Sequence, residues 1–372
     1  MAIFDLVFEG GGAKGSVFVG ALEVFFEAGH QAARVVGTSA GAITAALLAA
    51  GYTPKMMLAA VTETDAKGNP RFASFMDRPT APELDDFLSE SEFSQMMGKV
   101  NLPMVPGILQ DKLKRKLLEE LLEHSDHFRQ VFHFVECGGL YSGNTFVAWL
   151  NEKLSAVGVP EGSTLAQLHA QKGCDLSLIA TDTTNREMLV LNHRTAPKLP
   201  VAMAVRMSMS IPFLWREVTW KESWGTYCDR DKTDSKIVDG GVLSNFPIDL
   251  VATINERVKL LMGNDADPDA NGTLGLLIDE TLEVKDIPAA APRHQTLRTV
   301  GRVQRLVDTM TRAHDNASIG QHAKMICRLP AKGFGTTEFD MPKTKIEALL
   351  EAGRIAMRSH LAAPKLNSAA AG

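Results

Sequence analysis

The sequence lacks any run of about 18 consecutive apolar residues, the length that a helix needs to cross a bilayer. Its first apolar run contains Asp5 and Glu9, and charges there argue against a signal peptide. Cysteine is also scarce, and the four cysteines lie far apart without a C-x-x-C pair. This spacing suits neither a zinc site nor a disulfide framework. We therefore expect reduced thiols in a cytosolic protein whose only contact with a membrane is peripheral.

The sequence also lacks an excess of basic residues. It has 39 Lys and Arg against 44 Asp and Glu, a net charge of -5, which argues against general nucleic-acid binding. Hydrophobic residues make up 45% of the 372 positions, as in a globular protein with one large α/β domain or two ordinary ones. We find no internal repeat and no clear linker between domains.

A nucleophile motif follows a short apolar strand around residues 34–36. It is Gly37-Thr38-Ser39-Ala40-Gly41, with the G-x-S-x-G spacing of a nucleophile elbow. In such an elbow the serine lies at a strained turn between a strand and a helix, and the glycines let other backbone segments come close. The residues from Ala40 to about Ala50 are rich in Ala and Leu and lack Pro. They predict a helix whose N-terminal amides point at the Ser39 oxygen.

A second glycine-rich turn lies nearer the N-terminus. A buried strand is predicted over residues 3–8 and a helix over 17–28, and between them lie Gly10-Gly11-Gly12-Ala13-Lys14-Gly15. The glycine spacing formally matches a dinucleotide-binding loop, but the elbow occupies the place where that site needs an acidic residue. The spacing around Lys14 does not fit a Walker A loop either. We therefore favour an oxyanion hole formed by the amides of Gly11 and Gly12. Lys14 either adds positive charge there or is a solvated lysine.

A carboxylate at the end of a third strand completes this set of residues. The strand is predicted over residues 236–239 and ends in Asp239-Gly240-Gly241, a tight turn that presents the Asp239 carboxylate at an edge of the sheet. Asp182 ends another predicted strand and is the rival base. A conventional Ser-Asp-His triad is formally possible with a histidine downstream of Asp239, although the candidates fall in helical patterns. These histidines are His294, His314, His322 and His360.

Residues 52–142 form a less regular insertion that is rich in Met, Phe and Leu. Within it, residues 112–124 predict an amphipathic helix with one apolar face, made by Leu113, Leu117, Leu118, Leu121 and Leu122. We interpret the insertion as a helical subdomain that buries this face. A mobile lid or a lipid-facing cap is the alternative. Toward the C-terminus the patterns predict strands over 273–278 and 325–329, helices over 294–322 and 343–361, and a disordered tail over 364–372.

In their order along the chain, these motifs resemble those of the patatin-like phospholipase family. The resemblance rests on the two glycine-rich turns, on Ser208-Met209-Ser210-Ile211-Pro212 and on Asp239-Gly240-Gly241, with Thr181-Asp182 and Asn245-Phe246-Pro247 as comparable segments. It covers residues 3–260 and implies a three-layer α/β fold, with a mostly parallel central sheet flanked by helices and a helical insertion. We expect residues 261–363 to pack on the same domain.

The resemblance also implies roles for individual residues. Ser39 is the expected nucleophile and Asp239 the direct general base, without histidine. The expected oxyanion hole comprises Gly10, Gly11, Gly12, Lys14 and Gly15. The implied activity is hydrolysis of phospholipid or lysophospholipid esters through an acyl-enzyme, with peripheral membrane contact and with neither metal nor cofactor. The alternatives are an acyltransferase that uses the same dyad and, less favoured, a non-catalytic lipid-binding protein.

Overall fold

The computed structural model describes residues 1–80, 91–99, 106–263, 272–285, 302, 305, 309 and 315–363. Within them, eight strands form one central sheet: β1 (Ile3–Phe8), β2 (Gln31–Thr38), β4 (Asp175–Asp182), β5 (Glu187–Leu191), β7 (Val218–Thr219), β8 (Lys236–Asp239), β9 (Gly272–Glu283) and β10 (Ile326–Lys332). The strand order is β10-β9-β1-β2-β4-β8-β7, and β5 also pairs with β4. Neighbouring strands in the order β10-β9-β1-β2-β4 pair in parallel, whereas the pairs that involve β5, β7 and β8 are antiparallel. The predicted α/β fold with a mostly parallel central sheet is confirmed.

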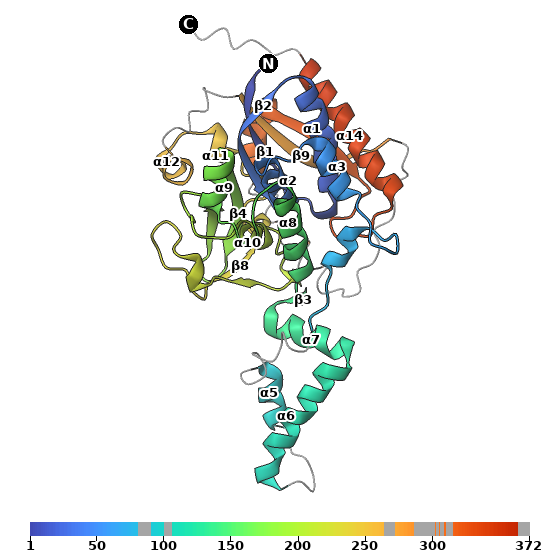
Figure 1. Ribbon diagram of the computed structural model, residues 1–372, viewed down its shortest axis with the longest axis vertical. Coiled ribbons are helices and arrows are strands. Elements are labelled where there is room, and N and C mark those ends of the chain that lie inside the picture. Colours follow the sequence, from blue (N-terminus) through green and yellow to red (C-terminus); the bar gives the residue numbers. More distant parts are fainter. Residues whose placement is uncertain are drawn as a thin grey trace.

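Helices cover both faces of this sheet and give three layers. One face is covered by α1 (Ser16–Glu27), α2 (Ala40–Ala49), α3 (Pro54–Val61), α8 (Asn144–Ala156), α9 (Leu165–Lys172), α10 (Val201–Ser208) and α14 (Lys343–Ala362). The other is covered by α11 (Asp249–Ala252) and α12 (Glu256–Met262). Figure 1 shows α1 and α14 packed side by side, with α11 and α12 at the opposite side of the molecule. Three short 3-10 helices, η2 (Arg71–Phe75), η4 (Glu222–Trp224) and η6 (Ala323–Met325), lie in connections.

The central strands are apolar on both sides, which explains why both faces of the sheet need helices. In β1, Leu6 and Phe8 belong to the apolar cluster beneath α1 and α14, whereas Val7 belongs to the cluster beneath α11 and α12. Val35 and Val36 of β2 divide between the two clusters in the same way. Neighbouring side chains of a strand point to opposite faces, so a strand buried on both sides reads as a continuous apolar run.

The strand β4 brings the ends of β2 and β8 together. β2 pairs in parallel with the first five residues of β4, β8 pairs antiparallel with its last three, and β5 pairs with its last five. A strand has only two edges, and β5 overlaps both of the other partners, so β2 and β8 lie along the same edge of β4. They run toward each other and end opposite neighbouring residues: Thr38 pairs with Ile179, and Asp239 pairs with Ala180.

Three helices project from the main body and form what we call the arm: α5 (Glu92–Lys99), α6 (Gly107–His124) and α7 (Asp126–Cys137). In Figure 1, α7 leads from the main body to a bend, and α6 extends from the bend to the tip of the arm. A small apolar cluster holds the arm together: Leu118, Leu122 and Phe132, with Phe93, Met97, Phe128 and Cys137 at its edge. The arm joins the body beside a two-stranded sheet of β3 (Gly139–Tyr141) and β6 (Phe213–Trp215).

The arm buries only two of the five leucines that the amphipathic pattern places on one face. Leu118 and Leu122 are buried in the apolar cluster of the arm, as expected. Leu113, Leu117 and Leu121 are exposed, because that cluster contacts only one side of α6. The prediction that the whole apolar face is buried was therefore wrong for these three leucines.

The predicted C-terminal strands correspond to β9 and β10, and the last predicted helix corresponds to α14. The helix expected over 294–322 lies partly outside the described residues, of which 302, 305, 309 and 315–321 are helical. The predicted tail, 364–372, lies outside them altogether. β9 pairs with β1 in the central sheet, and the proposed division of the chain near residue 260 stays a prediction.

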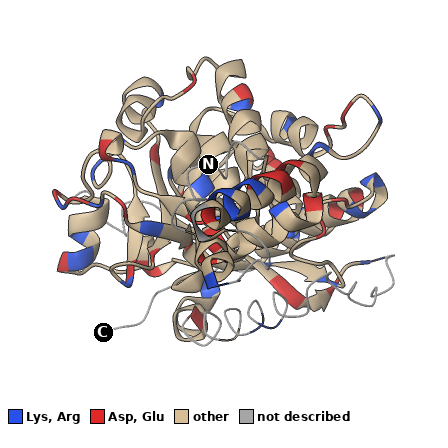
Figure 2. Cartoon of the chain, turned by 90° about the horizontal axis from the view of Figure 1, so that it is seen from below, with Lys and Arg blue, Asp and Glu red and all other residues tan. Residues whose placement is uncertain are grey.

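Charged residues of both signs are interspersed along the chain when the molecule is viewed from below (Figure 2). Among the helices that the structure describes, none is at once long and apolar enough to cross a membrane.

Candidate active site

Ser39 lies at a strained turn between β2 and α2. Its φ of 53° and ψ of -117° are unusual for a residue with a side chain, and a conformation of this kind costs about 1–3 kcal/mol. The flanking glycines make the turn possible. A Cβ atom on Gly37 would lie 2.3 Å from the carbonyl oxygen of Gly41, and one on Gly41 would lie 2.3 Å from that of Phe8. Backbone packing at this corner therefore requires the G-x-S-x-G spacing.

The glycine-rich loop after β1 lies directly beside Ser39, because β1 and β2 are parallel neighbours. A Cβ atom on Gly10 would lie 3.2 Å from the Cβ atom of Ser39. One on Gly15 would lie 2.9 Å from the Cβ atom of Ala40. The two glycine-rich turns meet at the carboxyl ends of β1 and β2, where parallel sheets place their ligands.

Hydrogen bonds anchor this loop on both sides of its central glycines. The amide of Gly10 donates to the Asn245 carbonyl oxygen (3.0 Å), and the amide after Gly12 donates to the Thr336 carbonyl oxygen (2.9 Å). Gly12, in the short 3-10 helix η1 (Gly12–Gly15), has a φ of 55°, and a Cβ atom there would lie 2.0 Å from the Thr336 oxygen. Within the described residues, the amides of Gly11 and Gly12 donate to no acceptor. Two such amides suit a developing oxyanion.

Lys14 is buried, with 3% of its surface exposed, so it is not a solvated lysine. Its Nζ atom forms an ion pair with Glu280 and donates a hydrogen bond to Thr336 Oγ1 (3.0 Å). The lysine thereby ties the loop to β9 and to the segment before α14. Since Glu280 offsets its charge, Lys14 acts first as an anchor of the loop, and its part in an oxyanion hole stays a prediction.

Glu9 immediately precedes the glycines and accepts two hydrogen bonds from neighbouring segments of the chain. Its Oε1 accepts a hydrogen bond from Asn245 Nδ2 (3.2 Å) and its Oε2 accepts one from the Ile278 amide (2.6 Å). Asn245 Nδ2 also donates to the carbonyl oxygen of Gly10 (3.0 Å). Removal from water raises the pKa of Glu9 to about 8; Asp315 adds to the rise, while the hydrogen bonds and Lys14 oppose it.

Asp315 holds the other side of Asn245. It is buried and accepts hydrogen bonds from the amides of Asn245 (2.9 Å) and Phe246 (3.0 Å) and from the Ser244 hydroxyl (3.4 Å). Sequence patterns alone miss both carboxylates. Glu9 borders a motif, which is a signal, whereas Asp315 lies in a polar helical stretch that contains no motif.

Asp239 lies at the end of β8, where it caps a short 3-10 helix, η5 (Gly240–Val242). Its Oδ1 accepts a hydrogen bond from the Gly241 amide (2.7 Å), and only 4% of its surface is exposed. A Cβ atom on Gly240 would lie 2.3 Å from the carbonyl oxygen of Ile179, so the turn packs against β4. Thr38 and Asp239 end opposite neighbouring residues of β4, which are roughly one strand step of 3.3 Å apart, so Ser39, directly after Thr38, lies at the same point of the sheet as Asp239.

The segment at the end of α10 links the nucleophile turn to the aspartate. Ser208 Oγ accepts a hydrogen bond from the amide of Ser39 (3.0 Å), and the carbonyl oxygen of Ser210 accepts one from the amide of Asp239 (2.9 Å). Arg206, with 2% of its surface exposed, donates to Ser210 Oγ and to the carbonyl oxygen of Ser142 (2.9 Å). The serines of this motif thus set the spacing between Ser39 and Asp239.

Asp182, the rival base, is held in a polar network. It is fully buried at the end of β4 and accepts hydrogen bonds from Lys232 Nζ (2.8 Å) and from the amide (2.9 Å) and Nδ2 (2.8 Å) of Asn185. Burial acts to raise the pKa of Asp182, but these hydrogen bonds outweigh it, and the pKa lies below the ordinary value. A carboxylate held ionised by a lysine is a weak proton acceptor, so the geometry favours Asp239.

The histidines of a conventional triad do not gather at Ser39 in the described residues. His322 Nε2 lies 2.9 Å from Asp249 Oδ1, and His360 lies on α14. His294 and His314 lie outside the described residues. The described residues also contain no group of three or more His, Cys, Asp or Glu that fits a metal ion.

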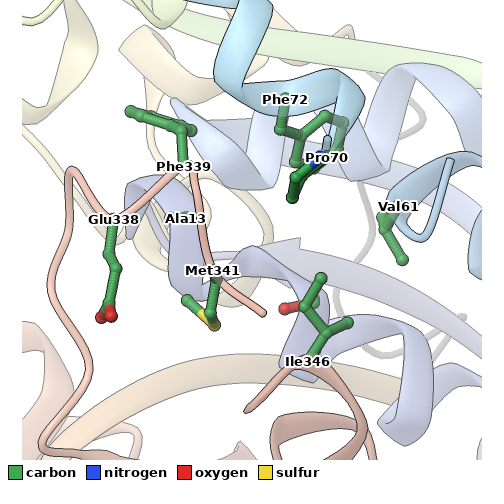
Figure 3. A pocket seen from close by; sticks show the side chains of 9 residues that line it. Ala13, Val61, Pro70, Phe72, Glu338, Phe339, Met341 and Ile346 are labelled. Carbon is green, nitrogen blue, oxygen red and sulfur yellow. The ribbon is translucent and has the colours of Figure 1, made fainter. Parts of the chain in front are cut away.

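A small apolar pocket lies behind the glycine-rich loop, where α1 begins (Figure 3). It is lined by Ala13, Ser16, Val61, Pro70, Phe72, Glu338, Phe339, Met341 and Ile346. Phe72 and Phe339 come from segments far apart in the sequence and face the same space in Figure 3. Ala13 of the loop thus lines the same pocket as Phe72 of η2 and Phe339 of the segment before α14.

Comparisons with known proteins identify a family for this chain. A model of the patatin-like phospholipase family matches residues 6–252. The uncharacterized protein YqhO of Bacillus subtilis (strain 168) is 31% identical over 357 residues, which are 94% of this chain and 95% of YqhO. VipD from Legionella pneumophila is 17% identical, with a TM-score of 0.49 over 96% of this chain and 66% of VipD. The type III effector ExoU of Pseudomonas aeruginosa is 19% identical, with a TM-score of 0.42 over 97% of this chain and 53% of ExoU. The chain therefore spans 66% and 53% of these two solved chains.

The family match includes both glycine-rich turns, the segment after α10 and the Asp239 turn. It therefore covers every motif on which the sequence resemblance rests, and that resemblance is confirmed. This chain belongs to the patatin-like phospholipase family.

Proposed function

We propose that this protein is a lipid acyl hydrolase of the phospholipase A or lysophospholipase type, with Ser39 as nucleophile and Asp239 as general base. The observation that carries this proposal is the meeting of β2 and β8 along one edge of β4. This meeting supports the pairing of a strained serine with a buried carboxylate, near two glycine amides that donate to no described residue. Nucleophile, base and oxyanion donors are the groups that acyl transfer needs.

The reaction has two halves. Asp239 takes the hydroxyl proton of Ser39 while Oγ attacks the acyl carbonyl carbon, and the amides of Gly11 and Gly12 stabilise the oxyanion, each by about 3 kcal/mol. The intermediate collapses to an acyl-enzyme, and the proton passes to the leaving alcohol. Water then attacks the acyl-enzyme, gives a proton to Asp239, and the fatty acid leaves as Ser39 regains its proton.

The Ser39 turn favours this chemistry over a structural role. A non-glycine residue with φ above zero is strained, and such strain is kept where the surrounding structure or the function demands it. Ser39 is also the N-cap of α2, whose first amides and positive dipole end favour negative charge near its oxygen. A plain turn at this position would use glycine, which avoids the strain.

The test uses a fluorophosphonate probe, which labels an activated serine, followed by release of fatty acid from labelled phospholipid. Wild type is compared with Ser39→Ala and Asp239→Asn. The control is Ser142→Ala, since Ser142 is buried and its hydroxyl has no partner in the described part of the chain. We expect Ser39→Ala to lose labelling and to release fatty acid at least about 10³-fold more slowly, with Asp239→Asn slower by about 10²–10⁴-fold.

Retained labelling in Ser39→Ala would reject Ser39 as the nucleophile. Full activity in a folded Asp239→Asn variant would reject the dyad. Addition of an alcohol during the assay separates hydrolysis from acyl transfer, because an acyltransferase forms the ester of that alcohol in place of free fatty acid.

A further inference from the structure

The arm carries a large share of the apolar surface that this protein exposes. Of the sixteen large apolar side chains exposed in the described residues, seven lie in the arm: Met96, Leu109, Leu113, Leu117, Leu121, Val131 and Val135. Exposed apolar side chains that gather on one part of a protein often mark a site of interaction.

The exposed leucines of α6 form one row along the helix. Leu109, Leu113, Leu117 and Leu121 recur every four residues, while Leu118 and Leu122 face the cluster of the arm. The exposed fraction rises steadily along the row toward the tip of the arm, from 37% at Leu121 to 54% at Leu109. The most exposed leucine is therefore the one nearest the N-terminal end of α6, the end that lies at the tip of the arm (Figure 1).

Charge along α6 divides at the middle of the helix. Toward the tip, the exposed charged side chains are Asp111, Lys112, Arg115 and Lys116, and toward the bend they are Glu119, Glu120, Glu123 and Asp126, the first residue of α7. Lys112 and Lys116 follow Leu109 and Leu113 by three residues, so each lies beside the leucine row. The tip is therefore both apolar and basic, although the whole chain has a net charge of -5.

We propose that the tip of the arm docks on an anionic lipid surface, with the leucines of α6 inserted among the acyl chains and Lys112 and Lys116 at the lipid headgroups. An apolar row bordered by lysines is the pattern of helices that bind at a membrane interface. This inference rests on the proposed lipid hydrolase function, and it names the surface through which the enzyme meets its substrate.

The charge pattern favours lipid over a second copy of the chain. Exposure increases toward the half of α6 that carries the exposed lysines and Arg115 against a single exposed acidic residue, Asp111, as suits a helix whose tip enters a negatively charged interface. A pair of arms would gain from burial along the whole row, including Leu121, which is the most covered of the four. Self-association therefore becomes an outcome of the test.

The base of the arm also contacts the segment that positions Asp239. After α7 the chain passes through β3 to Ser142, whose carbonyl oxygen accepts a hydrogen bond from Arg206 (2.9 Å). Arg206 in turn donates to Ser210, which accepts from the Asp239 amide. The arm is thus attached within a few hydrogen bonds of the proposed base.

Binding is measured by co-sedimentation with vesicles of phosphatidylcholine, with and without phosphatidylglycerol. Every variant carries Ser39→Ala so that no lipid is cleaved. Leu113→Ser/Leu117→Ser removes the row, and Lys112→Glu/Lys116→Glu reverses the charge. The matched controls change exposed residues of the main body: Leu260→Ser/Leu282→Ser and Lys324→Glu/Lys343→Glu.

We expect the leucine variant to lower the partition coefficient at least about tenfold. The lysine variant should lower it at least about fivefold, and only for vesicles that contain phosphatidylglycerol. Both control variants should bind like the parent protein. Circular dichroism verifies that α6 remains folded in each variant.

Three results would overturn the docking proposal. In the first, the parent protein does not sediment with anionic vesicles. In the second, the arm variants sediment as well as their controls. In the third, the leucine variant abolishes a dimer in sedimentation velocity and leaves vesicle binding intact, which makes the arm a self-association surface. Hydrolysis of a soluble short-chain ester by the Ser39 protein tests the proposed function separately, so failure of one proposal is not mistaken for failure of the other.

Discussion

The edge of the sheet around Ser39 is closely packed, whereas the arm is loosely packed. At the sheet edge, a Cβ atom on Gly37 or Gly41 would lie 2.3 Å from a carbonyl oxygen, and Ser39 and Asp239 are 5% and 4% exposed. In the arm, a cluster of three buried residues holds three helices, and Leu109 is 54% exposed. Each residue at the edge is fixed by several neighbours, whereas the outer row of α6 contacts few.

This difference separates a region whose structure is determined by the local sequence, the sheet edge, from a region whose exposed surface needs a binding partner to cover it, the arm. At the sheet edge, a substitution disturbs backbone, hydrogen bonds and ion pairs together, so its effect on stability should be large. On the outer row of α6, a substitution should leave the free protein unchanged and alter only binding. Three measurements test this contrast.

The largest expected effect comes from Asp182→Asn, beside the active site. This change removes the ion pair between Asp182 and Lys232, which is 3% exposed. Breaking a buried ion pair lowers the free energy of unfolding by about 3–5 kcal/mol. Urea unfolding of the variant against wild type measures the loss. Asp234→Asn, at an exposed position, is the control and should change the free energy of unfolding by less than about 0.5 kcal/mol.

The same variant also tests the assignment of the base. A loss of stability below about 1 kcal/mol would show that the Asp182 network is not tightly coupled to the fold. If Asp182→Asn stays folded and loses all ester hydrolysis while Asp239→Asn retains it, Asp182 is the base.

The next effect is the pH dependence that Glu9 imposes. Its pKa of about 8 in the folded protein exceeds its ordinary value of 4.5, so between these values the folded state holds a proton that the unfolded chain has released. Stability should therefore fall as pH rises from about 4.5 to about 8, by at most about 1.4 kcal/mol per pH unit, and level off above. Lys14, Asp315 and Asn245 face this carboxyl, and their contributions are already part of its pKa.

Urea unfolding of wild type and Glu9→Gln at pH 5, 6, 7 and 8.5 measures this slope. The variant should lose the part of the slope that Glu9 causes. The readout is the slope and not the absolute stability, because an amide cannot accept both hydrogen bonds that Glu9 receives from Asn245 and Ile278. Identical slopes in the two proteins would show that Glu9 is ionised at neutral pH.

Sequence reasoning succeeded at the sheet edge because the determinants there are local. The strand over residues 3–8, the two glycine-rich turns and the strand over 236–239 all lie where the patterns predict them. Each motif consists of residues whose backbone needs appear in the sequence itself: glycine where another chain segment approaches, and apolar runs where both faces are buried.

Long-range pairing was harder to predict. Residues 213–215 pair with β3 and residues 218–219 pair with β8, in different sheets, although they are close neighbours in the sequence. Asp315 reaches Asn245 across about 70 residues, and no pattern near it indicates that contact. Register and partner choice depend on the whole fold, which a single sequence does not display.

The arm shows a different limit. The spacing of the leucines predicted an amphipathic helix correctly, since α6 includes residues 112–124. It predicted burial of the whole apolar face, because an apolar row usually faces a core. Periodicity identifies an apolar row but not what covers it, so the exposure of Leu113, Leu117 and Leu121 emerges only from the fold.

The smallest expected effect is that of Leu113→Ser/Leu117→Ser on the free protein. Both side chains already face solvent in α6, so the free energy of unfolding should change by less than about 0.5 kcal/mol, and hydrolysis of a soluble ester should stay at the wild-type rate. Leu118→Ser, one residue farther along the helix, is the matched contrast, because it places a hydroxyl in the cluster of the arm and should melt the arm at a cost of about 2–5 kcal/mol. Thermal unfolding by circular dichroism and a soluble-ester assay measure both variants. If the outer pair destabilises the protein as much as Leu118→Ser does, the row is covered within the molecule itself, and the contrast between a closely packed edge and an open arm is wrong.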